Sequence, residues 1–128
     1  MLLAGTLFWS APEVLETRPY SNRADIYSLG IVMAEMAINR RYPYEDDVAA
    51  LPIWDFRSAI ASGTRPRLPE TTTAPDGFVG LMIQCQKGDP HTRPSAKQVV
   101  MALEELLKTM TIPTNSELSE ILRRQAAY

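Results

Sequence analysis

Several features that would point to particular classes of protein are scarce in this 128-residue sequence. It has one cysteine, Cys85, so it cannot form an internal disulfide, and this suits a reducing compartment. Thirteen basic side chains are scattered among fifteen acidic ones, so no basic stripe suggests nucleic-acid binding. The longest apolar stretch, residues 31–38, includes Glu35 and is too short to cross a bilayer.

Targeting signals and metal-ligand clusters are also missing. The N-terminus has no positively charged flank and no convincing cleavage site, so we expect no signal peptide. The only histidine, His91, lies in a proline-rich loop, where a solvated turn residue is expected. The acidic run at residues 45–47 lacks ligand spacing and suggests a solvated loop, or a contact to a basic substrate. We therefore expect one cytoplasmic domain with no metal, membrane or nucleic-acid partner.

Ten prolines separate segments in which apolar residues recur with helical spacing. The spacing predicts helices over residues 26–38, 54–63, 76–87 and 95–110, and a last one beginning near residue 115. Asn22 with Asp25, Ser95 with Gln98, and Asn115 are the expected caps. No segment alternates convincingly between polar and apolar residues, so the predicted fold class is mainly α.

The predicted helix over residues 26–38 is apolar on nearly every side, which is typical of a helix buried all round. Gly30, in its middle, costs about 1 kcal/mol of helix propensity relative to alanine. We therefore expect a neighbouring backbone to pack closely against Gly30.

Four motifs in a fixed order give the chain a resemblance to eukaryotic protein kinases. In chain order they are Ala11-Pro12-Glu13, Asp25 with Tyr27-Ser28-Leu29-Gly30, IASGTRPRL at residues 60–68, and CQKGDPHTRPS at residues 85–95. They match A-P-E, D-x-[WY]-S-x-G, I-x-x-G-x-R-P and C-x-x-x-D-P-x-x-R-P-[ST] of that family. The resemblance implies a helical C-terminal lobe of the kinase fold at residues 1–110, without the N-terminal β lobe. Residues 111–128 would then be a C-terminal extension with one short helix.

Residues just before the A-P-E motif indicate the subgroup. Gly5-Thr6 is the pair usual in serine/threonine kinases, and Trp9 together with the R-P loop resembles the tyrosine-kinase-like group of those enzymes. By the same resemblance Gly5, Thr6, Leu7, Phe8 and Trp9 would bind the protein substrate, with Thr6 near the catalytic base. Without the resemblance, Gly5-Thr6 is only a turn and residues 7–9 are only core.

The resemblance also implies two structural roles. Glu13 would form an ion pair with Arg93, whose planar fork suits a carboxylate; the alternative is two unrelated surface charges. Asp25 would accept hydrogen bonds from backbone amides of the catalytic loop, a role compatible with capping its own helix.

The parts that perform phosphate transfer are absent from the sequence. It has no G-x-G-x-x-G, V-A-I-K, H-R-D or D-F-G motif, so ATP and magnesium are implied only for a full-length parent. We therefore expect no catalytic residue and no cofactor in this chain. Alone it is predicted to be an inactive, substrate-positioning half of a kinase.

A different class of function stays open, namely a non-catalytic module that docks on a kinase or on a substrate protein. Trp54 and Phe56 would form its docking surface, unless both pack inward, and the terminal helix from Asn115 is a further candidate for that surface. Under either hypothesis the central helix lacks expected neighbours, and exposed apolar surface favours association. We expect a partner to cover it, either the missing N-terminal half of the kinase or another protein, and expect the isolated chain to be marginally folded or sticky.

Overall fold

The computed structural model describes residues 7–39, 42–110 and 113–126, and within these ranges it contains helices and no strand. This confirms the mainly α fold class predicted from the sequence. The elements are α2 (Pro12–Leu15), α3 (Arg23–Ile38), α4 (Asp46–Ala49), α5 (Ile53–Ala61), α6 (Asp76–Cys85), the 3₁₀ turn η1 (Pro90–Thr92), α7 (Ala96–Thr109) and α8 (Asn115–Ala126). None of the described helices is both long and apolar enough to cross a membrane.

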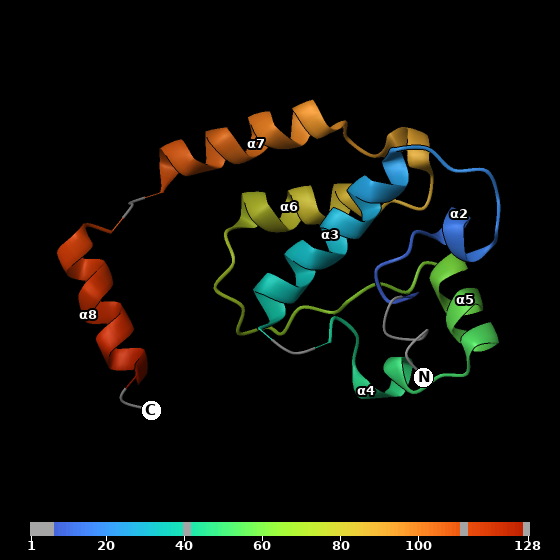
Figure 1. The fold of residues 1–128 in the computed structure, drawn as a ribbon, viewed down its shortest axis with the longest axis horizontal. Helices are drawn as coiled ribbons and strands as arrows, with labels where there is room; N and C mark the ends of the chain where they lie inside the picture. The colour runs from blue at the N-terminus through green and yellow to red at the C-terminus, as the bar shows by residue number, and fades with distance from the viewer. Residues whose placement is uncertain (1–6, 40–41, 111–112, 127–128) are drawn as a thin grey trace.

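The helix α3 runs through the middle of the fold (Figure 1). Along one side it packs on α6, which in turn packs on α7, while α2 packs on α5 at the other end of the molecule. The last helix, α8, stands apart from this body. Residues just before α2, in α6 and in η1 therefore meet around α3.

The buried residues form four clusters, and α3 contributes to three of them. Its first turns place Tyr27 and Ile31 beside Ala11, and its last turns place Met33 against Met82 of α6. The remaining α3 cluster joins Ile26 to Cys85 and Val99. This arrangement explains why α3 is apolar on so many sides.

At Gly30 the helix α3 packs closely against α6. A Cβ atom placed on Gly30 would lie 2.8 Å from Cys85 Cβ and 3.3 Å from the Met82 carbonyl oxygen. The close packing expected from the sequence is therefore confirmed, because no larger residue fits this helix crossing without a shift.

The helix caps agree with the sequence at one place and differ at two. Ser95 and Gln98 form the predicted capping box of α7. Asn22 does not cap α3, because its backbone is already helical (φ −60°, ψ −13°), and Ser21 Oγ instead accepts a bond from the Arg23 N–H. At α8, Thr114 rather than Asn115 caps the helix, in a reciprocal pair with Glu117.

The helix predicted over residues 54–63 is α5, and it ends in a Schellman motif. Gly63 has φ +108°, and its N–H bonds to the Ile60 carbonyl while the Thr64 N–H bonds to the Ala59 carbonyl. The acidic run at residues 45–47, expected to be a loop, instead opens the single-turn helix α4.

One face of the central helix is exposed in the structure. Leu29, Val32 and Met36 are 37%, 42% and 69% exposed, although all three belong to a helix whose remaining apolar residues are mostly buried. Exposed apolar surface of this kind marks an interaction site or an aggregation hazard.

Candidate functional site

The site is built around Glu13, in the first turn of the short helix α2. Ala11 precedes the helix in an extended conformation, and Pro12 starts it at a position where the missing N–H of proline costs nothing. Glu13 is buried, with 2% of its surface exposed. A carboxylate in such a place needs a charged or hydrogen-bonding partner.

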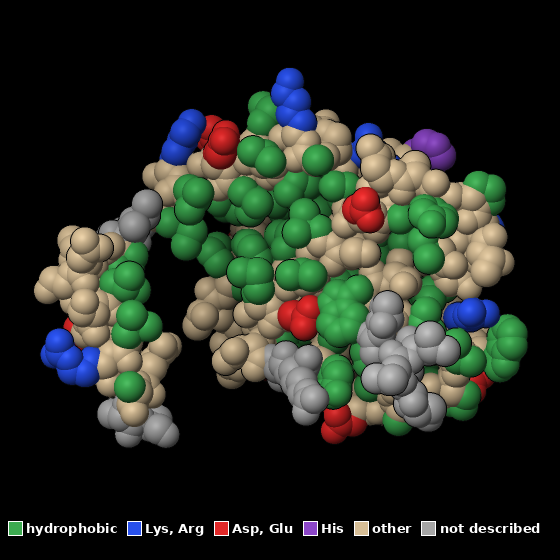
Figure 2. Space-filling view, viewed as in Figure 1, with side chains coloured by type: hydrophobic (Ala, Val, Ile, Leu, Met, Phe, Trp, Pro, Cys, Tyr) green, Lys and Arg blue, Asp and Glu red, His purple; other side chains and the backbone are tan. Residues whose placement is uncertain are grey.

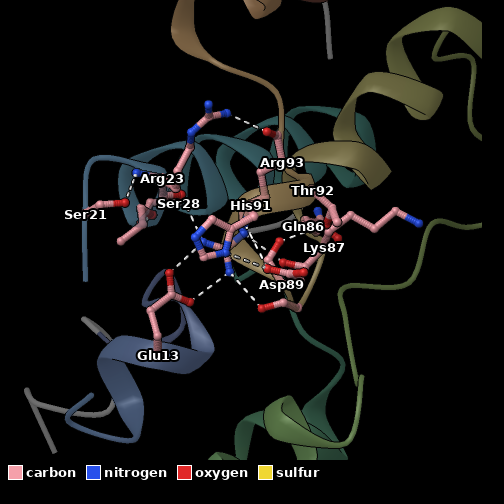
Figure 3. A network of polar contacts seen from close by, with 12 residues as sticks. Glu13, Ser21, Arg23, Ser28, Gln86, Lys87, Asp89, His91, Thr92 and Arg93 are labelled. Carbon is pink, nitrogen blue, oxygen red and sulfur yellow. Dashed lines mark hydrogen bonds and ion pairs between the residues drawn. The ribbon is translucent and has the colours of Figure 1, made fainter. Parts of the chain in front are cut away.

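Arg93, which follows η1, is that partner. Its two terminal nitrogens donate to the two carboxylate oxygens of Glu13, with Nη1–Oε2 at 2.7 Å and Nη2–Oε1 at 2.8 Å. Figure 3 shows the Glu13 carboxylate pointing at the guanidinium group. The geometry is the bidentate pairing expected of arginine with a carboxylate.

The remaining N–H groups of Arg93 are also satisfied. Nε donates to the Lys87 carbonyl at 2.7 Å, Nη1 to the Arg23 carbonyl at 3.0 Å, and Nη2 to the Gly88 carbonyl at 3.3 Å. The Arg93 side chain is fully buried, and every donor of its fork is used. It therefore connects α2, the start of α3 and the loop before η1.

The ring of Tyr27 lies beneath this network. The guanidinium carbons of Arg93 and Arg65 are each 5.1 Å from its centroid. Arg65 in turn donates to the Ile60 and Thr64 carbonyls at 2.9 and 2.7 Å and to the Gln86 carbonyl at 2.8 Å. Through these hydrogen bonds Arg65 connects the end of α5 to the end of α6, and its guanidinium group lies over the same Tyr27 ring as that of Arg93.

The pKa of Glu13 is lowered from its ordinary value of 4.5. Burial alone would raise this pKa, but the hydrogen bonds from Arg93 and from the Glu13 backbone, together with the charges of Arg93 and Arg18, outweigh burial. The carboxyl group is therefore ionised at neutral pH, and the ion pair is intact. Burial also raises the pKa of the Cys85 thiol, which keeps that residue an inert part of the core.

The predicted substrate-binding residues fall into three groups. Gly5 and Thr6 lie outside the described residues. Phe8 is buried against Tyr44 and Phe56, so its side chain belongs to the core and is not available to a substrate, which corrects its predicted role. Leu7 and Trp9 are only partly buried and lie at the edge of that cluster.

Trp9 is fixed to the central helix at two points. Its indole N–H donates to Glu35 at 2.5 Å, and its carbonyl accepts a 2.6 Å bond from the Ser28 hydroxyl. No pattern in the sequence predicted these contacts of Trp9. Ser28 belongs to the motif formed by Asp25 and Tyr27-Ser28-Leu29-Gly30, and this motif could have indicated a structural role for it. No motif in the sequence includes Glu35.

Two other predicted residues are exposed. Asp25 lies on the surface in the first turn of α3, and no described residue donates a hydrogen bond to its carboxylate.

Of the predicted docking pair, Trp54 is 71% exposed with Arg57 stacked over its ring, but Phe56 is 4% exposed. Phe56 is therefore core, and the pair does not form one surface, because the two residues point to opposite sides of α5.

Metal ligands and histidine chemistry do not add to this site. Across residues 7–39, 42–110 and 113–126, no group of three His, Cys, Asp or Glu side chains is arranged to hold a metal ion. His91 is exposed, and its one ion-pair partner among the described residues is Asp89, which caps η1 by accepting the His91 N–H at 2.9 Å.

Comparison with known proteins decides the family. Residues 1–103 match the family described as the protein kinase domain. The chain belongs to the protein kinase family. The Glu13–Arg93 pair therefore joins the A-P-E motif of the kinase family to the arginine of the C-x-x-x-D-P-x-x-R-P-[ST] motif at residues 85–95.

The kinases most similar to this chain include several mitogen-activated protein kinase kinase kinases. Over 104 residues the chain is 36% identical to mitogen-activated protein kinase kinase kinase 12 of Rattus norvegicus and 38% identical to kinase kinase kinase 13 of Homo sapiens. It is also 36% identical over 104 residues to mitogen-activated protein kinase kinase kinase 7 of Bos taurus. Each match covers 81% of this chain but only 11%, 10% and 17% of the relative. The chain therefore corresponds to a small part of these kinases.

Proposed function

We propose that this chain is the substrate-positioning half of a serine/threonine-type protein kinase of the tyrosine-kinase-like group. The observation that carries the proposal is the buried, bidentate Glu13–Arg93 pair, which fixes α2 and the residues just before it. The similarity to mitogen-activated protein kinase kinase kinases supports the choice of group.

The geometry suits positioning rather than bond breaking. Residues 7–9 emerge directly before α2, and the Trp9 backbone and side chain are held by Ser28 and Glu35. A substrate segment lying beside Leu7 and Trp9 would meet a surface whose support is rigid. Catalysis gains from such fixed alignment, because reacting groups must be held close and correctly oriented.

The transfer of phosphate is assigned to parts of a longer parent protein. Those parts would bind ATP and magnesium and supply the aspartate that accepts the hydroxyl proton of the substrate. This chain alone would then be inactive. It would need its missing kinase half, or another protein, on the exposed side of α3 where Leu29 and Val32 lie.

The first test is the sequence of full-length messenger RNA upstream of Met1. A reading frame that continues through H-R-D and D-F-G supports the proposal, and the longer protein is then assayed with ATP on serine, threonine and tyrosine peptides. Transfer to serine or threonine is expected, with none by the 128-residue chain alone. Transfer to tyrosine only, or by the short chain, would contradict it.

A matched pair of substitutions then tests positioning in the longer protein. Leu7→Ala should raise the KM for a protein substrate about tenfold or less, the usual range for a lost apolar contact, and change the KM for ATP little. Val100→Ala, an exposed change on α7, should leave both values unaltered. Equal effects of the two substitutions would argue against substrate contact at Leu7.

One observation favours the second candidate, a non-catalytic docking module. Trp54 exposes 71% of its surface on α5, and exposed tryptophan is common at binding hot spots. A message that begins at Met1, together with binding of the chain to a kinase that Trp54→Ala abolishes, would favour this function over the first.

A further inference from the structure

An apolar groove of about 460 Å³ lies where the ends of α3 and α7 meet the start of α6. Its lining includes Met36 from α3, Phe78 from α6, and Leu106, Leu107 and Met110 from α7 and its end. Met36, Leu107 and Met110 are 69%, 56% and 48% exposed. Figure 2 shows hydrophobic side chains gathered below α7 on the side toward α8.

The helix α8 carries a matching apolar face. Leu118, Ile121 and Leu122 follow the three- and four-residue spacing of one helix side, yet they are 45%, 44% and 57% exposed. Among the described residues, the hydrogen bonds and ion pairs of α8 all lie within residues 114–126. In Figure 2, hydrophobic atoms of α8 lie on its side toward the body.

We propose that α8 docks into this groove of its own chain, antiparallel to α7, with Leu118, Ile121 and Leu122 against Met36, Leu107 and Met110. Residues 110–114 connect the two helices, which is within the loop length of about 2–5 residues typical of antiparallel helix pairs. Met110 itself lines the groove, so the connection starts at the rim.

The order of charges on the two helices supports the antiparallel direction. Along α8 the acidic residues Glu117 and Glu120 precede Arg123 and Arg124. Along α7 the acidic pair at residues 104–105 likewise precedes Lys108. Antiparallel packing places the acidic half of α8 near Lys108 and its basic half near residues 104–105, whereas parallel packing would align like charges.

The tether favours the helix of the same chain over that of a second copy. A short connection gives α8 an effective concentration near the groove of about millimolar, far above the concentration of free protein in a typical assay. This inference needs no kinase activity, so it stands or fails independently of the proposed function.

Disulfide trapping in the full chain tests the docking. Met36→Cys with Leu118→Cys pairs the groove with the apolar face of α8, and Met36→Cys with Ser116→Cys is the control on the opposite face. The native Cys85 is buried and should not interfere. The first pair should form an intramolecular disulfide at least about tenfold faster than the control, at a rate independent of protein concentration.

Two results of the trapping would overturn the proposal. Equal, slow reaction of both pairs would mean that α8 does not enter the groove. Cross-linked dimers that increase with protein concentration would mean that the occupant is a second copy.

Dye binding gives a second measurement that does not depend on added cysteines. Ile121→Asp should release α8 and raise the fluorescence of a dye that binds exposed apolar surface, while Ser116→Asp should not. Circular dichroism checks that both variants keep their helix content. Unchanged fluorescence in Ile121→Asp would overturn the proposal.

Discussion

Arg23 and Arg93 exchange hydrogen bonds although they are 70 positions apart. Arg23 Nη1 donates to the Arg93 carbonyl at 2.5 Å, and Arg93 Nη1 donates to the Arg23 carbonyl at 3.0 Å (Figure 3). Each of the two positively charged guanidinium groups is therefore bound by the backbone carbonyl oxygen of the other arginine. The exchange fixes the start of α3 to the end of η1, so that Arg93 already faces Glu13.

Replacing Arg93 should cause a large loss of stability. Arg93→Met leaves the Glu13 carboxylate buried without a partner, which typically costs about 3–5 kcal/mol. Arg93→Lys keeps the charge but loses the fork that reaches both carboxylate oxygens, so it should also destabilise the fold. The free energy of unfolding in urea measures both effects.

The matched control is Arg123→Lys on α8. Arg123 pairs with Glu120 on the surface, where an exposed pair contributes about 0–1 kcal/mol. Its replacement should change stability little. A loss of equal size at Arg93 and Arg123 would mean that the Glu13–Arg93 pair is not a buried structural pair.

The Glu13 carboxylate should make stability depend on pH in the acid range. Its folded-state pKa is lower than the unfolded value of 4.5, because burial is outweighed by the hydrogen bonds from Arg93 and the Glu13 backbone and by the charges of Arg93 and Arg18. The folded state then binds fewer protons than the unfolded state, so this stabilisation is complete above about pH 4.5 and is lost as pH falls through the folded pKa.

A comparison with Glu13→Gln isolates this effect from those of Asp89 and Glu117, whose pKa values are also lowered. The stability difference between wild type and Glu13→Gln should be constant near neutral pH and shrink below about pH 4.5. A difference that stays constant to pH 3 would show that the pKa of Glu13 is not lowered in the folded state.

The sequence predicted most helices because their signals are local. The capping box of Ser95 and Gln98 lies within one turn, and the glycine that ends α5 acts on its own backbone. The cap at Asn22 was predicted wrongly because residue type alone does not show that its backbone is already helical. Which residue caps a helix depends on its backbone angles φ and ψ, and residue type alone does not determine them.

The polar site was less predictable than the helices. Glu13 and Arg93 were paired through a resemblance to kinases, since nothing local connects residues 80 positions apart. The two stacked arginines on Tyr27 and the bond from Trp9 to Glu35 depend on tertiary packing, so no spacing rule finds them. Phe56 and Trp54 are similar in type, and only the direction of α5 separates the buried one from the exposed one.

Removing the Tyr44 hydroxyl should leave the fold as stable or make it more stable. Tyr44 is buried among Phe8 and Phe56, and its hydroxyl lies near that of Tyr27 without reaching hydrogen-bond geometry with it. Burial, and after it the neighbouring Tyr27, raise the pKa of Tyr44. An unsatisfied buried polar group costs about 1–3 kcal/mol, which Tyr44→Phe would recover in part. Thermal unfolding measures the change, with exposed Tyr20→Phe as a control expected to show none. A clear loss in Tyr44→Phe would show that the hydroxyl has a partner in solution.

Two glycines in helices should respond in opposite ways to alanine. At Gly30 the new Cβ would lie 2.8 Å from Cys85 Cβ and 2.9 Å from Gln86 Cγ, closer than carbon atoms approach. The helices must then separate, and overpacking of this kind typically costs about 1–3 kcal/mol, more than the propensity of alanine returns. At Gly80 in α6 a Cβ meets nothing within 4 Å, so alanine should stabilise by about 0.4–1 kcal/mol. The free energy of unfolding in urea, measured for both variants, tests this prediction. If Gly30→Ala were also stabilising, α3 and α6 would not pack as closely at Gly30 as the structure shows.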